Sequence, residues 1–176
     1  MTGTNDGAGV RAAQSTGQRP GQATTLDDLD RRILALFNES PKLGVLEASR
    51  RLSVARGTVQ ARIDRLQRAG VITSWAPSVS PAALGFEVTA FITCEIDQQH
   101  GRDTVAAHLA TIPEVLECWT ITGTGDLWCR IVAQSNPDVQ RVVDLMHTSK
   151  GVVRTSTLIA LAEQIGFRTE PLIQQH

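Results

Sequence analysis

The sequence lacks the features that would place the chain in or across a membrane. Its longest apolar runs fall well short of the roughly 18 residues that a membrane helix needs. The first 25 residues contain no apolar stretch of the kind that forms a secretory signal. We therefore expect a cytoplasmic protein without a membrane segment.

Metal-binding and catalytic patterns are also lacking. Cys94, Cys118 and Cys129 match neither a C-x-x-C motif nor a zinc ribbon, and we expect reduced, partly buried thiols. The four histidines form no metal-ligand cluster, and no Ser-His-Asp or Cys-His constellation is present. We expect no metal, no cofactor and no catalytic residue. An enzyme remains the main alternative class, because α+β folds also host enzymes.

Charge is unevenly distributed along the chain. The formal net charge is only −1, yet residues 26–76 carry +3 and residues 77–176 carry −5. Residues 50–68 alone hold six arginines and one acid. A basic front joined to an acidic back favours a polyanion as the partner of the front half.

The 176 residues are enough for one ordinary domain or two small ones, and 41% hydrophobic residues suit a folded protein. Residues 1–24 are rich in Gly, Thr, Gln and Ala, and their few large apolar side chains predict a disordered tail. We assign residues 25–76 to a first domain, 77–86 to a hinge containing Pro77 and Pro81, 87–170 to a second domain, and 171–176 to a C-terminal tail.

Helical periodicity dominates the first domain. Thr25 and Asp28 resemble a capping box, and apolar residues at helical spacing follow it up to Phe37. Further helices are expected over residues 44–52 and 55–69, the latter ended by Gly70. Residues 71–76 are β-rich and favour a short wing or the start of a linker strand. Three short helices with a tight turn before the third indicate a winged-type helix-turn-helix.

The third of these helices carries the candidate DNA contacts. Val59, Ile63 and Leu66 supply its buried stripe, so the opposite side is free for the major groove of double-stranded DNA. Arginine pairs bidentately with guanine and glutamine with adenine, whereas arginines further along the helix suit phosphate contacts. An ordinary solvated arginine-rich helix is the alternative. The candidate DNA-binding residues are Arg56, Gly57, Thr58, Gln60, Ala61, Arg62 and Arg65.

The second domain alternates between strand and helix patterns. Strands are expected over residues 87–96, 115–122, 127–133 and 152–162, and helices over 102–112 and 136–149. This βαββαβ order is the ferredoxin-like arrangement, so the fold class is α+β. A four-stranded sheet with helices on one face needs cover on its other face, and a second copy of the chain would provide it. We therefore expect a homodimer.

Several motifs in a consistent order resemble the Lrp/AsnC, or feast/famine, family of transcriptional regulators. Residues 26–34 (LDDLDRRIL) resemble the opening of that family, and residues 59–72 (VQARIDRLQRAGVI) its recognition helix and exit. Trp75, Pro81 and the 84–85 Leu-Gly pair resemble its hinge. Pro113, residues 115–118 (VLEC) and residues 122–126 (TGTGD) resemble the core of its effector domain. The resemblance runs from about residue 25 to 170.

The sequence departs from the family pattern at three places. Ser53-Val54-Ala55 replaces the usual Gly-Leu-Ser, and loss of the serine cap at Ala55 weakens the helix start by about 1 kcal/mol. Ala48 replaces a common leucine. Gly125 replaces a common aromatic residue, and this change bears most on the choice of ligand.

The resemblance implies a sequence-specific regulator whose DNA binding or assembly responds to an amino acid or related metabolite bound between subunits. It also implies higher assembly such as an octamer. The candidate ligand-binding residues are Thr122, Gly123, Thr124, Gly125 and Asp126. Backbone N–H groups at the glycines can meet a carboxylate, and Asp126 an ammonium group. A plain hairpin turn is the alternative for this loop. An effector-independent architectural DNA-binding protein is the alternative for the whole chain.

Overall fold

The computed structural model describes residues 24–97 and 99–174. The predicted tail over residues 1–24 lies outside the described residues except for its last position. The chain divides into two compact units, one made of residues 1–76 with 168–176 and the other of residues 77–167. The last segment thus groups with the front of the chain, whereas the sequence assigned it to the second domain and a C-terminal tail.

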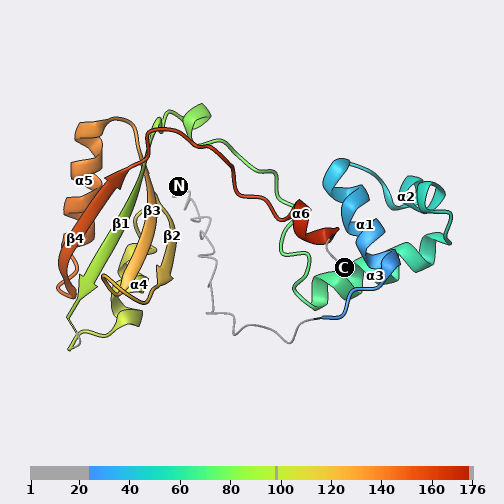
Figure 1. Cartoon of the computed structure of the whole chain (residues 1–176), viewed down its shortest axis with the longest axis horizontal. Helices are drawn as coiled ribbons and strands as arrows, with labels where there is room; N and C mark the ends of the chain where they lie inside the picture. Colours follow the sequence, from blue (N-terminus) through green and yellow to red (C-terminus); the bar gives the residue numbers. More distant parts are fainter. Residues whose placement is uncertain (1–23, 98, 175–176) are drawn as a thin grey trace, which may run out of the picture. The chain divides into compact units, whose positions relative to one another are not determined.

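The first unit contains α1 (Asp28–Glu39), α2 (Val45–Leu52), α3 (Arg56–Arg68) and the short α6 (Glu170–Ile173). The α6 helix lies against α1 (Figure 1). The Arg31 guanidinium Nη1 donates to the carbonyl oxygen of Ile173 over 3.1 Å. The sequence did not predict this helix, because its four residues carry no periodic pattern.

A reciprocal capping box starts α1, two residues later than predicted. Asp27 Oδ1 accepts from the Asp30 amide over 2.9 Å, and Asp30 Oδ2 accepts from the Asp27 amide over 3.0 Å. The expected pair, Thr25 and Asp28, is therefore wrong. Aspartate satisfies the free N–H groups of a helix start as well as threonine does, and its charge also suits the positive end of the helix dipole.

The predicted helical stripes meet in one apolar core. Val59, Ile63 and Leu66 of α3 are buried, as predicted, and pack with residues of α1 and α2. The α2 helix ends at Leu52, and its C-cap residue Ser53, with a left-handed φ of 56°, makes the tight turn into α3. Gly70, with φ 70°, follows the last turn of α3 as expected.

Residues 71–76 form no strand, although their composition favoured one. The amides of Val71 and Ile72 both donate to the Leu66 carbonyl oxygen, over 2.9 and 3.2 Å, and their side chains pack against the helical core. The ring of Trp75 meets Phe37 edge-on at 5.4 Å between centroids. Packing on the helices thus replaces strand pairing in this segment.

The second unit is a four-stranded antiparallel sheet in the order β2-β3-β1-β4, with two helices on one face (Figure 1). Its elements are η1 (Ala82–Leu84), β1 (Val88–Ile96), α4 (Arg102–Leu109), β2 (Val115–Thr120), β3 (Leu127–Ala133), α5 (Asn136–His147) and β4 (Val152–Ile159). The predicted βαββαβ order and α+β class are confirmed. Each differing boundary moves by three residues or fewer, as expected where element ends fray.

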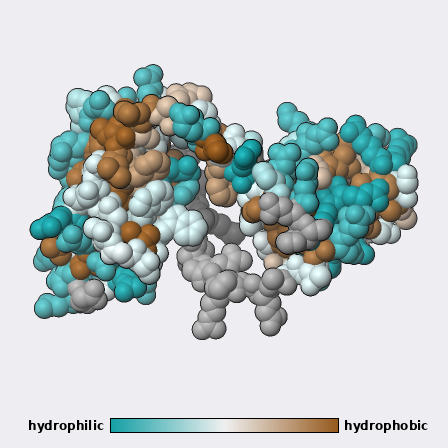
Figure 2. Space-filling model, viewed as in Figure 1, coloured by the Kyte–Doolittle hydropathy of each residue, from teal (hydrophilic) through white to brown (hydrophobic). Residues whose placement is uncertain are grey.

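Alternation along the strands separates a covered face from an open one. In β1, Ala90, Ile92 and Cys94 are buried beneath α4 and α5, whereas Phe91 lies on the other face and stacks on Trp128 at 5.3 Å between ring centroids. Large apolar side chains on this open face are exposed, including Trp119 at 61% and Leu158 at 65%. Figure 2 shows apolar groups gathered over the C-terminal end of β4.

Among the described residues, none of the helices combines the length and the apolarity needed to cross a bilayer.

Candidate nucleic-acid interface and effector loop

The exposed side of α3 presents most of the predicted DNA-binding residues together. Arg56, Gly57, Thr58, Gln60 and Ala61 are all exposed. They occupy the first two turns, opposite the buried stripe, and in this motif the N-terminal part of the recognition helix is what reaches base edges. The Gln60 side-chain amide donates to Asp64 Oδ1 over 2.8 Å, which restrains its orientation on the helix surface.

The start of α3 is left open. Ala55 is the N-cap and makes no side-chain capping bond, as the sequence predicted. A Cβ built on Gly57 would meet no atom within 4 Å, so internal packing does not require a glycine there. Because Gly57 and Ala61 are small, the sugar-phosphate backbone of DNA could come close to the exposed side of α3 at this point.

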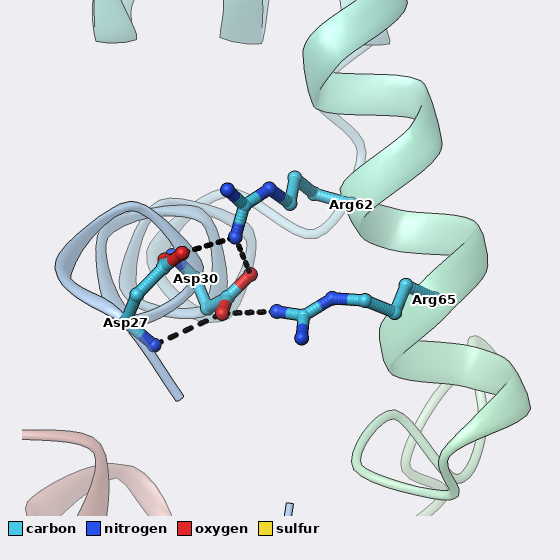
Figure 3. A network of polar contacts seen from close by, with 4 residues as sticks. All are labelled: Asp27, Asp30, Arg62 and Arg65. Atoms are coloured by element: carbon cyan, nitrogen blue, oxygen red, sulfur yellow. Dashed lines mark hydrogen bonds and ion pairs between the residues drawn. The ribbon is translucent and has the colours of Figure 1, made fainter. Parts of the chain in front are cut away.

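Arg62 and Arg65 lie differently from the other candidates, because both reach back to the start of α1 (Figure 3). Arg62 Nη1 pairs with Asp27 and, over 3.2 Å, with Asp30 Oδ1; Arg65 Nη2 pairs with Asp30 Oδ2. Asp30 is fully buried, while the arginines keep 31% and 40% of their side chains exposed. This network fastens α3 to the N-terminus of α1.

Hydrogen bonds set the electrostatics of this network. The Asp30 amide and the Arg62 guanidinium lower the pKa of Asp27 to about 2, and Asp27 in turn raises the pKa of Arg62. Arg62 and Arg65 were predicted to contact phosphates. In the structure their side chains already have carboxylate partners, and the sequence signal for this is a pair of acids and a pair of arginines, each three residues apart.

The predicted effector loop connects β2 to β3 through a tight turn. Gly123 and Gly125 have φ values of 103° and 94°, where residues with a Cβ are strained. Thr122, Gly123 and Thr124 are exposed, whereas Gly125 and Asp126 are half-buried against β1. The five predicted residues thus lie together, with three of them open to solvent.

Asp126 braces this loop. Its Oδ2 accepts from the Ile96 amide over 2.9 Å, and its own amide donates to the Cys94 carbonyl oxygen over 2.8 Å. The β1–β3 register ends at the Cys94–Leu127 pair, so the carboxylate satisfies an Ile96 N–H group that lies beyond the end of that ladder. Its predicted role, accepting from a ligand's ammonium group, would have to use the remaining acceptor capacity of the carboxylate.

Gly125 is held close to β1. A Cβ at this position would lie 3.1 Å from Thr93 Cγ2 and 3.3 Å from the Cys94 carbonyl oxygen, so a larger residue would have to push these atoms aside by a few tenths of an ångström and adopt a strained positive φ. The hollow beside it measures about 30 Å³ and is lined by Thr93, Glu95, Thr124, Gly125, Arg154, Thr155 and Ser156. That volume suits one water molecule, so the single chain does not enclose an amino acid there.

A larger groove runs between α5 and β4, which sequence reasoning did not find. It measures about 690 Å³ and is open to solvent. Polar side chains line most of it, including Gln140, Asp144, His147 and Thr157. The His147 Nε2 and Thr155 Oγ1 atoms, both from residues that line the groove, lie 3.0 Å apart. No sequence motif marks it, because it arises from the edge position of β4 beside the polar side of α5.

Comparison with known proteins gives matches to both units. The family of winged helix-turn-helix DNA-binding domains matches residues 26–73, and the Lrp/AsnC ligand binding domain matches residues 89–167. An HTH-type transcriptional regulator of Pyrococcus abyssi is 34% identical over 135 residues, covering 76% of this chain and 85% of the relative. The names of these families and of this relative describe transcriptional regulators and not enzymes.

Solved structures share the fold. The structure of Escherichia coli AsnC is 27% identical with a TM-score of 0.77, covering 84% of this chain and 100% of that chain. A transcriptional regulator from Neisseria meningitidis, crystallised as a complex with L-methionine, is also 27% identical, with a TM-score of 0.74. That match covers 81% of this chain and 94% of the other.

Proposed function

Because the chain belongs to the Lrp/AsnC family of HTH-type transcriptional regulators, we propose that it binds DNA sequence-specifically and that an amino acid or related metabolite modulates this binding or the protein's assembly. The observation that carries the proposal is the exposed first half of α3. It presents the side chains of Arg56 and Gln60 to solvent, and the space beside Gly57 is empty of protein atoms. The cytoplasm is the compartment in which such a protein meets DNA.

The two kinds of arginine on α3 have separate roles. Arg56 is exposed at the helix start and is free to reach a guanine edge. Arg62 and Arg65 orient α3 through their carboxylate partners and present only their remaining N–H groups to phosphates. Base selection therefore belongs to the first two turns, and the correct presentation of those turns depends on the arginine–aspartate network.

Assembly completes the effector site. The open sheet face exposes Trp119 and Leu158, and a second copy would cover them as a homodimer. The hollow beside Gly125 is too small for an amino acid in one chain, so a ligand there would need walls from another subunit. Binding of L-methionine by the Neisseria relative supports an amino-acid ligand. Higher assembly, such as an octamer, would bring several loops together.

The DNA arm is tested with duplexes recovered from a random pool by repeated selection on the wild-type protein. Arg56→Ala should weaken binding to the selected duplex by roughly 1–3 kcal/mol and reduce its advantage over scrambled DNA. Arg102→Ala, which removes an exposed arginine from the start of α4, is the matched control and should keep the full preference. An unchanged preference in Arg56→Ala would contradict this assignment of α3.

The effector arm is tested by thermal shift with the twenty amino acids and related metabolites. A ligand that binds the folded state raises Tm by mass action. Thr124→Val should remove the shift without lowering the basal Tm, because Thr124 is exposed. Asp126→Ala should lower both, since it also frees the Ile96 amide. No shift with any compound would favour an architectural DNA-binding protein, with Gly125 as the residue that alters the pocket.

A further inference from the structure

Three cysteines that are far apart in the sequence lie side by side in the sheet. Cys118 is on edge strand β2, Cys129 on β3 and Cys94 on β1. The register pairs Cys118 directly with Cys129. Cys94 pairs with Leu127, two residues from Cys129 on the same face. A row of three thiols therefore crosses three neighbouring strands.

Hydrogen-bond phase shows what kind of pair Cys118 and Cys129 form. The Ile121 amide donates to the Asp126 carbonyl oxygen over 3.1 Å, which makes these two residues a hydrogen-bonded pair of the β2–β3 ladder. Antiparallel pairs alternate, so three steps along the ladder Cys118 and Cys129 form a non-hydrogen-bonded pair. Such pairs have Cα atoms about 4.5 Å apart, within the span that a disulfide bridges.

The three thiols differ in access and in acidity. Cys118 is exposed, whereas Cys94 and Cys129 are buried. The neighbouring Cys129 thiol lowers the pKa of Cys118, and the two neighbouring thiols raise the pKa of Cys129. Oxidants react with the thiolate, so reaction is favoured at a thiol that is both exposed and acidified. Cys118 meets both conditions, and Cys129 stands directly opposite it.

We propose that Cys118 and Cys129 are a peroxide-sensitive dithiol: Cys118 is the site of oxidation and Cys129 closes a reversible disulfide across β2 and β3. In the first step the Cys118 thiolate attacks a hydroperoxide, breaking the O–O bond and releasing water or an alcohol once a proton is taken up. The resulting sulfenic acid is attacked by the Cys129 sulfur, which forms the S–S bond and releases water. Both sulfurs are oxidised as the peroxide is reduced.

Oxidation is a better use of the cluster than metal binding. Within residues 24–97 and 99–174, no group of three or more His, Cys, Asp or Glu side chains is arranged to hold a metal ion. Cys118 is exposed, and an exposed disulfide is more readily reduced than a buried structural one. Reversibility of that kind distinguishes a redox-responsive pair from a structural disulfide.

The test treats the reduced full-length protein with hydrogen peroxide, counts free thiols by maleimide labelling, and maps linked peptides by mass spectrometry. Loss of two of the three thiols, one intramolecular Cys118–Cys129 peptide link, and full recovery with dithiothreitol are expected. A bond between chains, a Cys94–Cys129 bond, or an unchanged thiol count would overturn the proposal.

Variants separate the attacking thiol from the resolving one. Cys118→Ser changes an exposed residue, so the fold should persist. After peroxide treatment this variant should keep both of its remaining thiols free. Cys129→Ala should stop the reaction at a Cys118 sulfenic acid that dimedone captures. Cys94→Ala is the matched control and should form the disulfide as wild type does. Equal oxidation of Cys118→Ser and wild type would also overturn the proposal.

Discussion

Ser53 forms the left-handed turn between α2 and α3, with φ 56° and ψ 42°. This region costs a residue with a Cβ roughly 1–2 kcal/mol, whereas glycine adopts it freely. We predict that Ser53→Gly raises the free energy of unfolding by about 0.5–1 kcal/mol in urea titrations, after the greater chain entropy of glycine is subtracted. Ser40→Gly is the control: its φ is −131°, so the same change there should destabilise. A lower unfolding midpoint for Ser53→Gly would contradict this reading of the turn.

Asp30 is the buried centre of the arginine–aspartate network. Replacing its carboxylate with an amide keeps the shape but leaves Arg62 and Arg65 with a neutral partner. Breaking a buried pair costs about 3–5 kcal/mol, and the part-exposed arginines reduce this, so Asp30→Asn should lose roughly 2–4 kcal/mol. Asp28→Asn, on the same helix turn but 88% exposed, should scarcely move the midpoint. Equal midpoints for the two variants would count against the network.

Asp27 adds a pH dependence. Its folded-state pKa is lowered to about 2, first by the Asp30 amide and then by Arg62. A lowered folded pKa contributes stability above the unfolded value and loses it as pH falls toward the folded value. Asp27→Asn keeps an N-cap acceptor but removes the charge. The stability gap between wild type and Asp27→Asn should therefore be constant above about pH 5 and close between about pH 4 and pH 2. A gap unchanged at pH 3 in urea titrations would disprove this.

At the scale of the element, α3 has one side packed in the core and an exposed side that carries small residues. Gly57 is the second residue of α3 and has open space around it, so alanine there should raise the free energy of unfolding by about 0.5–1 kcal/mol, mainly by reducing the entropy of the unfolded chain. Gly57→Leu should keep the fold but weaken DNA binding, because the leucine side chain would occupy the open space beside α3 that the DNA backbone needs for close approach. Chemical unfolding and fluorescence anisotropy on the same preparations would measure the two effects. A Gly57→Leu variant that binds DNA as tightly as wild type would rule out close approach at this point.

Elements were predictable where their signals are local. The stripe of Val59, Ile63 and Leu66 follows from helical spacing alone, and the β3 bounds follow from a run between a glycine turn and a proline. Residues 71–76 misled because strand-forming side chains bury equally well against helices. The amino-acid composition of this segment therefore predicted correctly that its aliphatic side chains are partly buried, but it did not indicate whether the segment packs against strands or helices.

The sequence predicted which residues form the candidate sites better than it predicted what those residues contact. The exposed residues of α3 and the glycine turn after β2 come from short contiguous patterns. The pairing of Arg65 with Asp30 spans 35 positions, and the meeting of Cys118 with Cys129 depends on strand register. Neither contact can be predicted from the spacing of nearby residues. The sequence therefore predicted a phosphate contact for Arg65 and three separate thiols for the cysteines.

At the scale of the whole molecule, the open sheet face governs assembly. Leu158 pairs with Phe91 across β4 and β1 and is 65% exposed. If a second copy covers this face, Leu158→Lys should place a charge in the interface and shift sedimentation to a smaller species. Leu46→Lys, which changes an apolar residue 50% exposed on α2, is the control and should sediment as wild type. Identical sedimentation of Leu158→Lys and wild type would place the subunit contact elsewhere.

The pairing of α6 with α1 gives the helix-turn-helix unit an attachment at each of its ends. The backbone leaves that unit after Ala76 and returns to it at Arg168, so the two units are joined by two stretches of chain and not by one. A single protease cut in residues 77–81 would leave the unit held by α6, and a cut in residues 160–167 would leave it joined through residues 76 and 77. Removing residues 168–176 would leave residues 76 and 77 as the single covalent link between the two units.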